Sequence, residues 1–505
     1  MINANLNFIN DLNTLDLDQD VTSRLSLHLE RTYKGSKEVF ITPLAKEHGP
    51  EFIIEEFDKV FNANKFKLNE TLLKLEDSNR AKVGPRSIAI PWKERTTSLS
   101  VSFENTNNDN MDQANINSLS GRRRLRPISL ESALRLLKNN TNSGLPYYTN
   151  KGKVKERVLD KYDYLLKRQD PCILFTRTQE QNKTRNVWGF PMADTLNEMR
   201  YYSPLLAYQK ELNYRSALNS PDAVCSKLTE LILKSVNLRM SLLSVDFSAY
   251  DTSVKSKLQK IAFDYIKSMF QEMCESEIHY IAQRFNSIGI LTPSGIISGS
   301  HGVPSGSTFT NEVDSIVQAS ISMSLPYITE DSFQVQGDDG VYLLPYDKVD
   351  ELKQLFISSG LNVNEEKSYI SNNYAIYLQN LYHIDYLKNG IIGGIYPVYR
   401  ALNRLLYQER WANFEDFEIT GKDYYSIRTI CIVENCKHHP LFEELVKFVV
   451  KYDKYSLNVS DQGISKYIQM FKNTNGAGGF LNNQYSDNVS GIRSFETFKM
   501  VKEIG

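Results

Sequence analysis

The sequence predicts a mixed α/β (α+β) fold, and three observations support this expectation. Residues 222–240 have helical character and lead directly into the apolar segment MSLLSVDF, which is typical of a buried strand that ends on an acid. The segments FQVQ and VYLL enclose Gly337-Asp-Asp-Gly340, as in a strand, a tight turn and a second strand. A chain of 505 residues with 41% hydrophobic residues is also long enough for two or three packed lobes.

A further helix is expected between these two segments. From Thr308 to Leu325, the apolar residues Phe309, Val313, Ile316 and Val317 recur at helical spacing. In the chain, this helix would lie between the strand MSLLSVDF and the hairpin around Gly337-Asp-Asp-Gly340.

Polar and glycine-rich stretches indicate exposed segments. The run 105–121 is predicted to be a surface loop, and a glycine-rich tail near residues 476–479 has no assigned role. Either a solvated charge cluster or a nucleic-acid contact would explain the basic run that follows the loop: Arg122, Arg123, Arg124 and Arg126.

Composition limits the classes of protein that fit. Lys plus Arg (59) nearly balances Asp plus Glu (60), so a nucleic-acid binder with this charge must gather its cations on inner walls. Five cysteines, few and odd in number, favour a reducing compartment over a disulfide framework. No signal peptide and no apolar run of roughly 18 residues is apparent, so we expect a soluble, cytosolic protein without a membrane segment.

A second cysteine observation concerns zinc. Cys431, Cys436, His438 and His439 lie close together in the sequence. The cluster is compressed and lacks paired Cys-x-x-Cys spacing, so we do not expect a zinc site there.

Three acids stand where strands are expected to end. Asp246 closes one apolar segment, and Asp338 and Asp339 lie at the tip of the predicted hairpin. Carboxylate oxygens suit hard cations such as Mg²⁺. Acids at the ends of neighbouring strands would hold two metals roughly 4 Å apart for in-line phosphoryl transfer. Gly-Asp-Asp alone is a weak signal, since a chain of this length contains one by chance roughly one time in ten.

The order of other polar motifs strengthens this signal. Lys183 and Arg185 precede the acids and suit nucleotide phosphates. Between the acid sites, a Ser305-Gly306 loop opens the predicted helix and would bring its backbone close to a bound strand. After the hairpin, Lys367 is placed to donate a proton to leaving pyrophosphate.

At this point the chain resembles the RNA-dependent RNA polymerases of positive-strand and small double-stranded RNA viruses, picobirnaviruses first and partitiviruses second. The segments that carry the resemblance occur in family order over residues 141–382: TNSGLPY resembles motif G, NKTRNVWGFP motif F, SVDFSAYDTS motif A, GVPSGSTFT motif B, QGDDG motif C, GLNVNEEKS motif D and YLQNLY, more loosely, motif E.

The resemblance implies catalytic and metal roles. Asp246 and Asp338 would be the principal ligands of Mg²⁺, for which Mn²⁺ would substitute, with Asp339 supporting and Lys367 as general acid. The triphosphate and ribose would be bound by a second set of residues: Lys183, Arg185, Asp251, Ser305, Thr310, Asn311 and Asp314. The template would contact a third set: Ser143, Gly144, Pro146 and Gly306.

One position departs from the family pattern. Relatives often place Asn four residues after the motif B Thr, whereas this chain has Asp314 there and Asn311 directly after Thr310. Either Asp314 is protonated or bridged by solvent, or Asn311 or Thr310 donates to Asp251 instead. The sequence favours Asn311, which lies on an adjoining helix face and carries an amide donor.

The implied architecture is a right-hand polymerase. Its expected parts are an N-terminal region bridging fingers and thumb (1–120), fingers (121–235 and 258–298), palm (236–257 and 299–385) and thumb with tail (386–505). It would use RNA template, nascent RNA and NTPs, contact a viral capsid protein, and act in the host cytoplasm and the virion. One alternative is a reverse transcriptase or DNA polymerase, which would carry an aromatic residue at position 251, where this chain has Asp251. The other is an RNA-binding, capsid-associated protein that has lost its activity. The presence of Asp246, Asp338 and Lys367 argues against this second alternative.

Overall fold

The computed structural model describes residues 5–104, 119, 124–411, 414, 418–455, 457–473 and 491–504. The predicted loop 105–121, Arg122, Arg123 and the glycine-rich tail lie largely or wholly outside these residues. The chain divides into two compact units, and the first consists of Met1–Gly35, Pro91–Thr176 and Arg185–Leu378. The second consists of Ser36–Ile90, Arg177–Thr184 and Gln379–Gly505.

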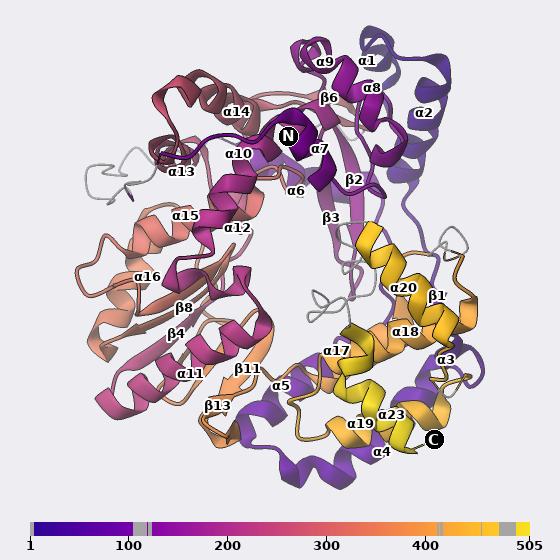
Figure 1. The fold of residues 1–505 in the computed structure, drawn as a ribbon, viewed down its shortest axis with the longest axis vertical. Coiled ribbons are helices and arrows are strands. Elements are labelled where there is room, and N and C mark those ends of the chain that lie inside the picture. Colours follow the sequence, from indigo (N-terminus) through magenta and orange to yellow (C-terminus); the bar gives the residue numbers. More distant parts are fainter. Residues whose placement is uncertain are drawn as a thin grey trace. The chain divides into compact units, whose positions relative to one another are not determined.

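The first unit is α/β and contains two four-stranded sheets, shown in Figure 1. Its helices are α1 (Ile9–Thr14), α2 (Gln19–Lys34), α6 (Trp92–Phe103), α7 (Leu130–Leu136), α8 (Lys155–Asp160), α9 (Tyr162–Arg168), α10 (Met192–Gln209), α11 (Pro221–Leu238), α12 (Tyr250–Ser253), α13 (Ser256–Met269), α14 (Glu275–Ser287), α15 (Thr310–Ser322) and α16 (Val349–Ser358). Its strands are β2 (Cys172–Thr178) and β3 (Thr184–Gly189), whose tip belongs to the second unit, and β4 (Ser241–Val245), β5 (Ile290–Thr292), β6 (Gly295–Ile297), β7 (Phe333–Gln336), β8 (Asp339–Leu344), β9 (Tyr369–Ser371) and β10 (Tyr374–Tyr377).

The second unit is mainly helical. Its helices are α3 (Pro43–Lys46), α4 (Pro50–Asn64), α5 (Glu70–Arg80), α17 (Val398–Leu406), α18 (Gly421–Glu434), α19 (Phe442–Tyr452), α20 (Asp461–Asn473), α22 (Gly491–Ser494) and α23 (Glu496–Ile504). Its short strands are β1 (Phe40–Ile41), β11 (Asn380–His383), β12 (Leu387–Lys388), β13 (Ile391–Ile392) and β14 (Tyr407–Gln408).

The sheet that positions the candidate site has the order β7-β8-β4-β9 and is antiparallel throughout. Leu243 and Val245 of β4 project into a buried core with residues of α13, α15 and α16, because alternate side chains of a strand point to one face. Helix α11 also contacts β4. In Figure 1, β4 and β8 lie side by side in this sheet.

The predicted local elements are confirmed. The helix expected over 222–240 is α11, the strand after it is β4, and the helix expected from Thr308 is α15. The predicted hairpin is β7–β8. None of the described helices has the length and apolar character needed to cross a membrane.

The compressed Cys and His cluster lies in the second unit. Cys431 and Cys436 are fully buried free thiols, and Nε2 of His439 lies 2.9 Å from Oε1 of Glu76. His439 is therefore engaged in a buried polar pair with a residue of α5.

Candidate active site

Three carboxylates gather at one end of the β7-β8-β4-β9 sheet. Val245, the last residue of β4, pairs with Gly340, so that Asp246 continues β4 opposite Asp339. Asp339 is the first residue of β8, and Asp338 lies in the turn before it. Neighbouring strands thus bring residues about 90 positions apart in the chain to one edge of the sheet.

The turn that carries Asp338 depends on glycine. Gly337 has φ +65°, while Asp338 is not among the residues with positive φ, which is the pattern of a type II′ hairpin turn. A Cβ atom at Gly340 would lie 2.0 Å from Oε1 of Gln318 and 2.9 Å from the Tyr342 ring. Close packing against α15 therefore excludes a side chain at Gly340.

Helix α15 holds this turn through three polar side chains. The Gln336 amide donates to Oδ1 of Asn311 at 2.7 Å, and the Gly337 N–H donates to Oγ of Ser315 at 2.7 Å. Nε2 of Gln318 donates to the Gly337 carbonyl at 2.9 Å. Positions 311, 315 and 318 share one helix face, which explains why all three reach the turn. The sequence analysis singled out Asn311 but not Ser315 or Gln318. The one sequence feature that could have indicated these two is that they are polar residues on a helix face expected to be buried.

Asp314, on the same helix, shares a side-chain hydrogen bond with Asp251 of α12. Burial, the charges of Asp251 and Asp338, and this bond raise the pKa of Asp314 well above its usual range. Burial and the Asp338 charge raise the pKa of Asp251, whereas the bond to Asp314 and the Arg185 charge lower it. The raised pKa favours the protonated form of Asp314, whose O–H group can donate a hydrogen bond to the Asp251 carboxylate.

This arrangement favours Asp314 as the donor to Asp251, whereas the role expected of Asn311 stays a prediction. Oδ1 of Asn311 accepts from Gln336, and the Thr310 hydroxyl donates to the carbonyl groups of Pro304 and Ser307. The physical reason is burial: at 3% exposure, Asp314 is more stable as a neutral acid than as a carboxylate.

The loop before α15 is fixed against β3. The Trp188 N–H donates to Oγ of Ser305 at 3.3 Å, and a Cβ atom at Gly306 would lie 1.6 Å from the Trp188 carbonyl oxygen. At Gly302 a Cβ atom would lie 2.5 Å from the Asp251 carbonyl oxygen. Glycines at both positions allow this loop to approach β3 and α12.

The buried Glu198 of α10, which the sequence did not single out, supports the same loop. Its carboxyl group accepts from Oγ of Ser307 and from the Thr308 N–H, each at 2.7 Å. Burial, opposed by these two bonds, raises the pKa of Glu198 to about 7. Its signal in the sequence is faint, because an isolated Glu on a helix is usually exposed.

The predicted cations occupy three different segments. Arg185 is exposed on β3 and acts electrostatically on Asp251. Lys183 is exposed in the turn between β2 and β3, which belongs to the second unit. Lys367 is exposed two residues before β9, and the Asp246 N–H donates to the side chain of the next residue, Ser368, at 3.1 Å. The structure thus brings Arg185 close to Asp251 and Lys367 close to Asp246.

The predicted template segment is built around a tight turn. Gly144 has φ +62°, and a Cβ atom there would lie 2.3 Å from the Phe190 carbonyl oxygen. Ser143 is completely buried, and its Oγ accepts from the Thr149 N–H at 3.2 Å. The expectation that Ser143 contacts the template is corrected, because its side chain supports the turn from inside; Pro146 is partly exposed.

The acids do not form a closed metal cage. Within the part of the chain that the structure describes, no group of three or more His, Cys, Asp or Glu side chains is arranged to hold a metal ion. The three predicted ligands thus share a sheet edge rather than a complete coordination shell.

Comparisons with known proteins show the family to which the chain belongs. The family model described as viral RNA-dependent RNA polymerase matches residues 91–453. The potential RNA-dependent RNA polymerase of a human picobirnavirus (strain Human/Thailand/Hy005102/-) is 29% identical over 87% of each chain. The RNA-directed RNA polymerase of Cryptosporidium parvum virus 1 is 25% identical over 50% of this chain and 53% of its own length.

Solved structures extend the likeness to the whole chain. The crystal structure of a human picobirnavirus RNA-dependent RNA polymerase superposes with a TM-score of 0.77 at 25% identity, covering 95% of this chain and 96% of the other. Its insertion-loop deletion mutant gives the same TM-score at 26% identity, covering 96% and 97%. The predicted resemblance and the mixed α/β fold are confirmed, and the chain belongs to the viral RNA-dependent RNA polymerases and is an RNA-directed RNA polymerase.

Proposed function

We propose that this polymerase copies a viral RNA genome by two-metal-ion nucleotidyl transfer at the sheet edge formed by Asp246, Asp338 and Asp339. The 3′-hydroxyl of the nascent strand would attack the α-phosphate of an NTP, and pyrophosphate would leave. The observation that carries the proposal is the register of β4, β7 and β8, which aligns the three acids.

The donor set fits Mg²⁺, or Mn²⁺ in its place. Carboxylate oxygens are its preferred ligands, and an incomplete protein shell leaves positions for water and phosphate oxygens. Negative charge also accumulates here. Burial is the largest cause of the raised pKa values of Asp251 and Asp314, and the charge of Asp338 raises both values further. When bound, the metal ions would neutralise charge that develops on the transferring phosphate.

Recognition of the nucleotide would follow from the residues around Asp251. Its carboxylate, held by the proton of Asp314, would accept a hydrogen bond from the ribose 2′-hydroxyl. Arg185 would bind the triphosphate with its planar guanidinium group, and Lys183 would assist as a point charge. Ser305, together with Thr310 and Asn311 on α15, would steady the motif B loop and the hairpin that bound the nucleotide.

The remaining roles follow the same pattern. Lys367 would protonate the leaving pyrophosphate, since it is exposed just before β9, which pairs with the strand β4 that precedes Asp246. Pro146, which is partly exposed, would line the path of the template, and Gly144 and Gly306 would shape that path by packing against the backbone of Phe190 and Trp188.

The proposed architecture is a right hand with fingers, palm and thumb and the boundaries given above. In it, the N-terminal region bridges fingers and thumb. We further propose that the polymerase contacts a viral capsid protein and acts in the host cytoplasm and inside the virion.

The test is template-directed synthesis with labelled NTPs and Mg²⁺ or Mn²⁺. Wild-type protein should yield template-length RNA, while Asp246→Asn and Asp338→Asn, which preserve side-chain shape, should not. Asp347→Asn, a matched change in the turn after β8, serves as control because Asp347 lies outside the sheet edge. Equal synthesis by Asp338→Asn and the control would refute the assignment.

A further inference from the structure

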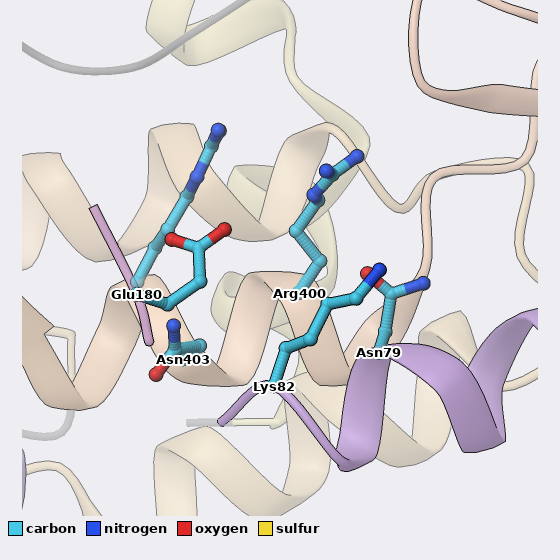
Figure 2. A pocket seen from close by; sticks show the side chains of 6 residues that line it. Asn79, Lys82, Glu180, Arg400 and Asn403 are labelled. Carbon is cyan, nitrogen blue, oxygen red and sulfur yellow. The ribbon is translucent and has the colours of Figure 1, made fainter. Parts of the chain in front are cut away.

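A cluster of positive side chains lies in the second unit. A pocket there is lined by Asn79, Lys82, Glu180, Arg400, Asn403 and Arg404. Figure 2 shows Lys82, Glu180 and Arg400 reaching this opening from three different segments of the chain. Helix α17 contributes two of the basic residues at positions 400 and 404, one turn apart on the same face.

Buried charges behind the pocket add to the positive field. Arg86 is 6% exposed and Arg428 is 4% exposed. Burial and the charge of Arg404 lower the pKa of Arg86, and burial with the charges of Arg86 and Arg404 lowers the pKa of Arg428 to about 10. These three guanidinium groups therefore repel one another, and the fold holds them together at a cost in stability.

Few carboxylates compensate this charge. Glu180 lies 3.5 Å from Nε of Arg86, and Glu409 lies 3.6 Å from Arg177. Among the described residues, no Asp or Glu oxygen is within 4.0 Å of Arg400 or Arg404, and both guanidinium groups lie over the Tyr396 ring. Glu180 nevertheless feels both charges, because Arg86, Arg400 and Arg404 all help to lower its pKa. The positive charge around the pocket exceeds the negative charge that the described residues supply.

The buried Arg86 connects this cluster to Glu180. Its Nε lies 3.5 Å from a carboxylate oxygen of Glu180, an ion pair longer than a normal hydrogen bond. Arg86 thus neutralises part of the charge of Glu180, the one acidic residue among those that line the pocket.

We propose that this pocket is a second phosphate-binding site, separate from the sheet-edge acids, that takes a compact polyphosphate such as the triphosphate group of a nucleotide. The pocket is shallow and open to solvent, so phosphate groups would bind at its mouth with the nucleoside left outside. Asn79 and Asn403 place amide groups at the rim of the pocket. The Oδ1 atom of Asn403 already accepts a hydrogen bond from the Gly84 N–H at 2.9 Å. Convergent arginines on a small opening favour a compact anion over an extended RNA backbone.

The test is equilibrium binding of inorganic tripolyphosphate to the full-length chain in buffer without divalent metal. Arg400→Gln and Arg404→Gln should each raise the Kd about tenfold or more, because each removes charge-assisted hydrogen bonds. Arg493→Gln is the matched control, since Arg493 is a surface arginine of the same unit paired with Asp461 at 2.9 Å. Unchanged tripolyphosphate affinity in both pocket variants would overturn the proposal.

Two further arms separate the sources of phosphate. GTP binding should fall in parallel with tripolyphosphate, whereas binding of an RNA oligonucleotide with a 5′-hydroxyl should change little. A loss confined to RNA would overturn the compact site and indicate a backbone contact instead. The experiment requires no synthesis, and Asp338→Ala should bind tripolyphosphate like wild type, so this result is independent of the proposed reaction.

Thermal melting adds a readout that a structural role would not produce. Tripolyphosphate should raise the Tm of wild type but leave the Tm of the Arg400→Gln/Arg404→Gln double variant unchanged. An equal rise of the Tm in both proteins would overturn the proposal.

Discussion

The pairing of Asp314 with Asp251 leads to a prediction about sugar selectivity. Asp314 is 3% exposed, and its raised pKa favours a neutral acid that shares a hydrogen bond with Asp251. Its oxygen Oδ1 has no hydrogen-bond partner among the described residues. Asp314→Asn replaces the acid O–H with an amide N–H of similar shape and leaves one oxygen in the same unpaired state. The Asn variant should therefore keep the donor and retain the preference for NTP over dNTP.

Asp314→Ala removes the donor altogether. A hydrogen bond to a charged group contributes about 1.5–3 kcal/mol, so losing it should reduce ribose discrimination roughly 10- to 150-fold. Asn311→Ala should have a smaller effect, because Asn311 contacts Gln336 and the hairpin rather than Asp251.

The assay is the ratio of kcat/KM for GTP to that for dGTP in each variant at one pH, with Tm measured as a control for folding. The expected order of discrimination is wild type and Asp314→Asn together, then Asn311→Ala, then Asp314→Ala. If Asn311→Ala collapses the ratio while Asp314→Ala leaves it intact, the role assigned to the acid pair is wrong.

Four other variants test separate features. Asp338→Ala should abolish template-length synthesis but leave RNA affinity nearly unchanged, because affinity comes mostly from phosphate contacts; a simultaneous loss of RNA binding would contradict a purely catalytic role. Arg185→Ala should lower kcat/KM for NTP roughly 10- to 150-fold through loss of a charge-assisted phosphate contact, as steady-state kinetics would reveal. Because the pKa of Glu198 is raised to about 7, its neutral form stabilises the fold below about pH 4.5, and this contribution is lost as pH rises through 7. The Tm of wild type should therefore fall relative to that of Glu198→Gln between about pH 5 and pH 8. Parallel curves of Tm against pH would refute this expectation. Gly306→Ala should lower the Tm and the synthesis rate, since its Cβ would lie 1.6 Å from a backbone oxygen of β3, whereas Gly84→Ala, with nothing within 4 Å, should do neither.

Local structure around the acids could be predicted from the sequence because its signals are local. An apolar run identified β4, and glycines on both sides of Asp338-Asp339 identified the hairpin. Helical periodicity identified α15. Strand register then follows once these elements pair, which is why the three acids were expected at one edge.

Contacts between distant segments could not be predicted in this way. Arg215 and Glu312 form a 2.6 Å ion pair, each side chain 1% exposed, although they are 97 residues apart. The position of neither residue in the sequence predicts this ion pair. Likewise, the choice between Asn311 and Asp314 depended on burial, since neighbouring faces of one helix look alike until the surrounding core is known.

The division of the chain into two compact units could not be predicted from the sequence for the same reason. Residues 177–184 include the end of β2, the turn after it and the first residue of β3, yet they belong to the unit built mainly from 379–505. The basic pocket with Glu180 and Arg400 was therefore invisible from the sequence, because its members come from segments more than 200 residues apart.

The single face of α15 that holds the hairpin has an evolutionary consequence. Asn311, Ser315 and Gln318 each bond to the turn or the residue before it, and Gln318 also closes the space above Gly340. A substitution at one of these positions alters the fit at the others, so they should vary together among diverging viral lineages. For the same reason, chimeric polymerases should tolerate exchange of α15 together with its hairpin, but not of either alone.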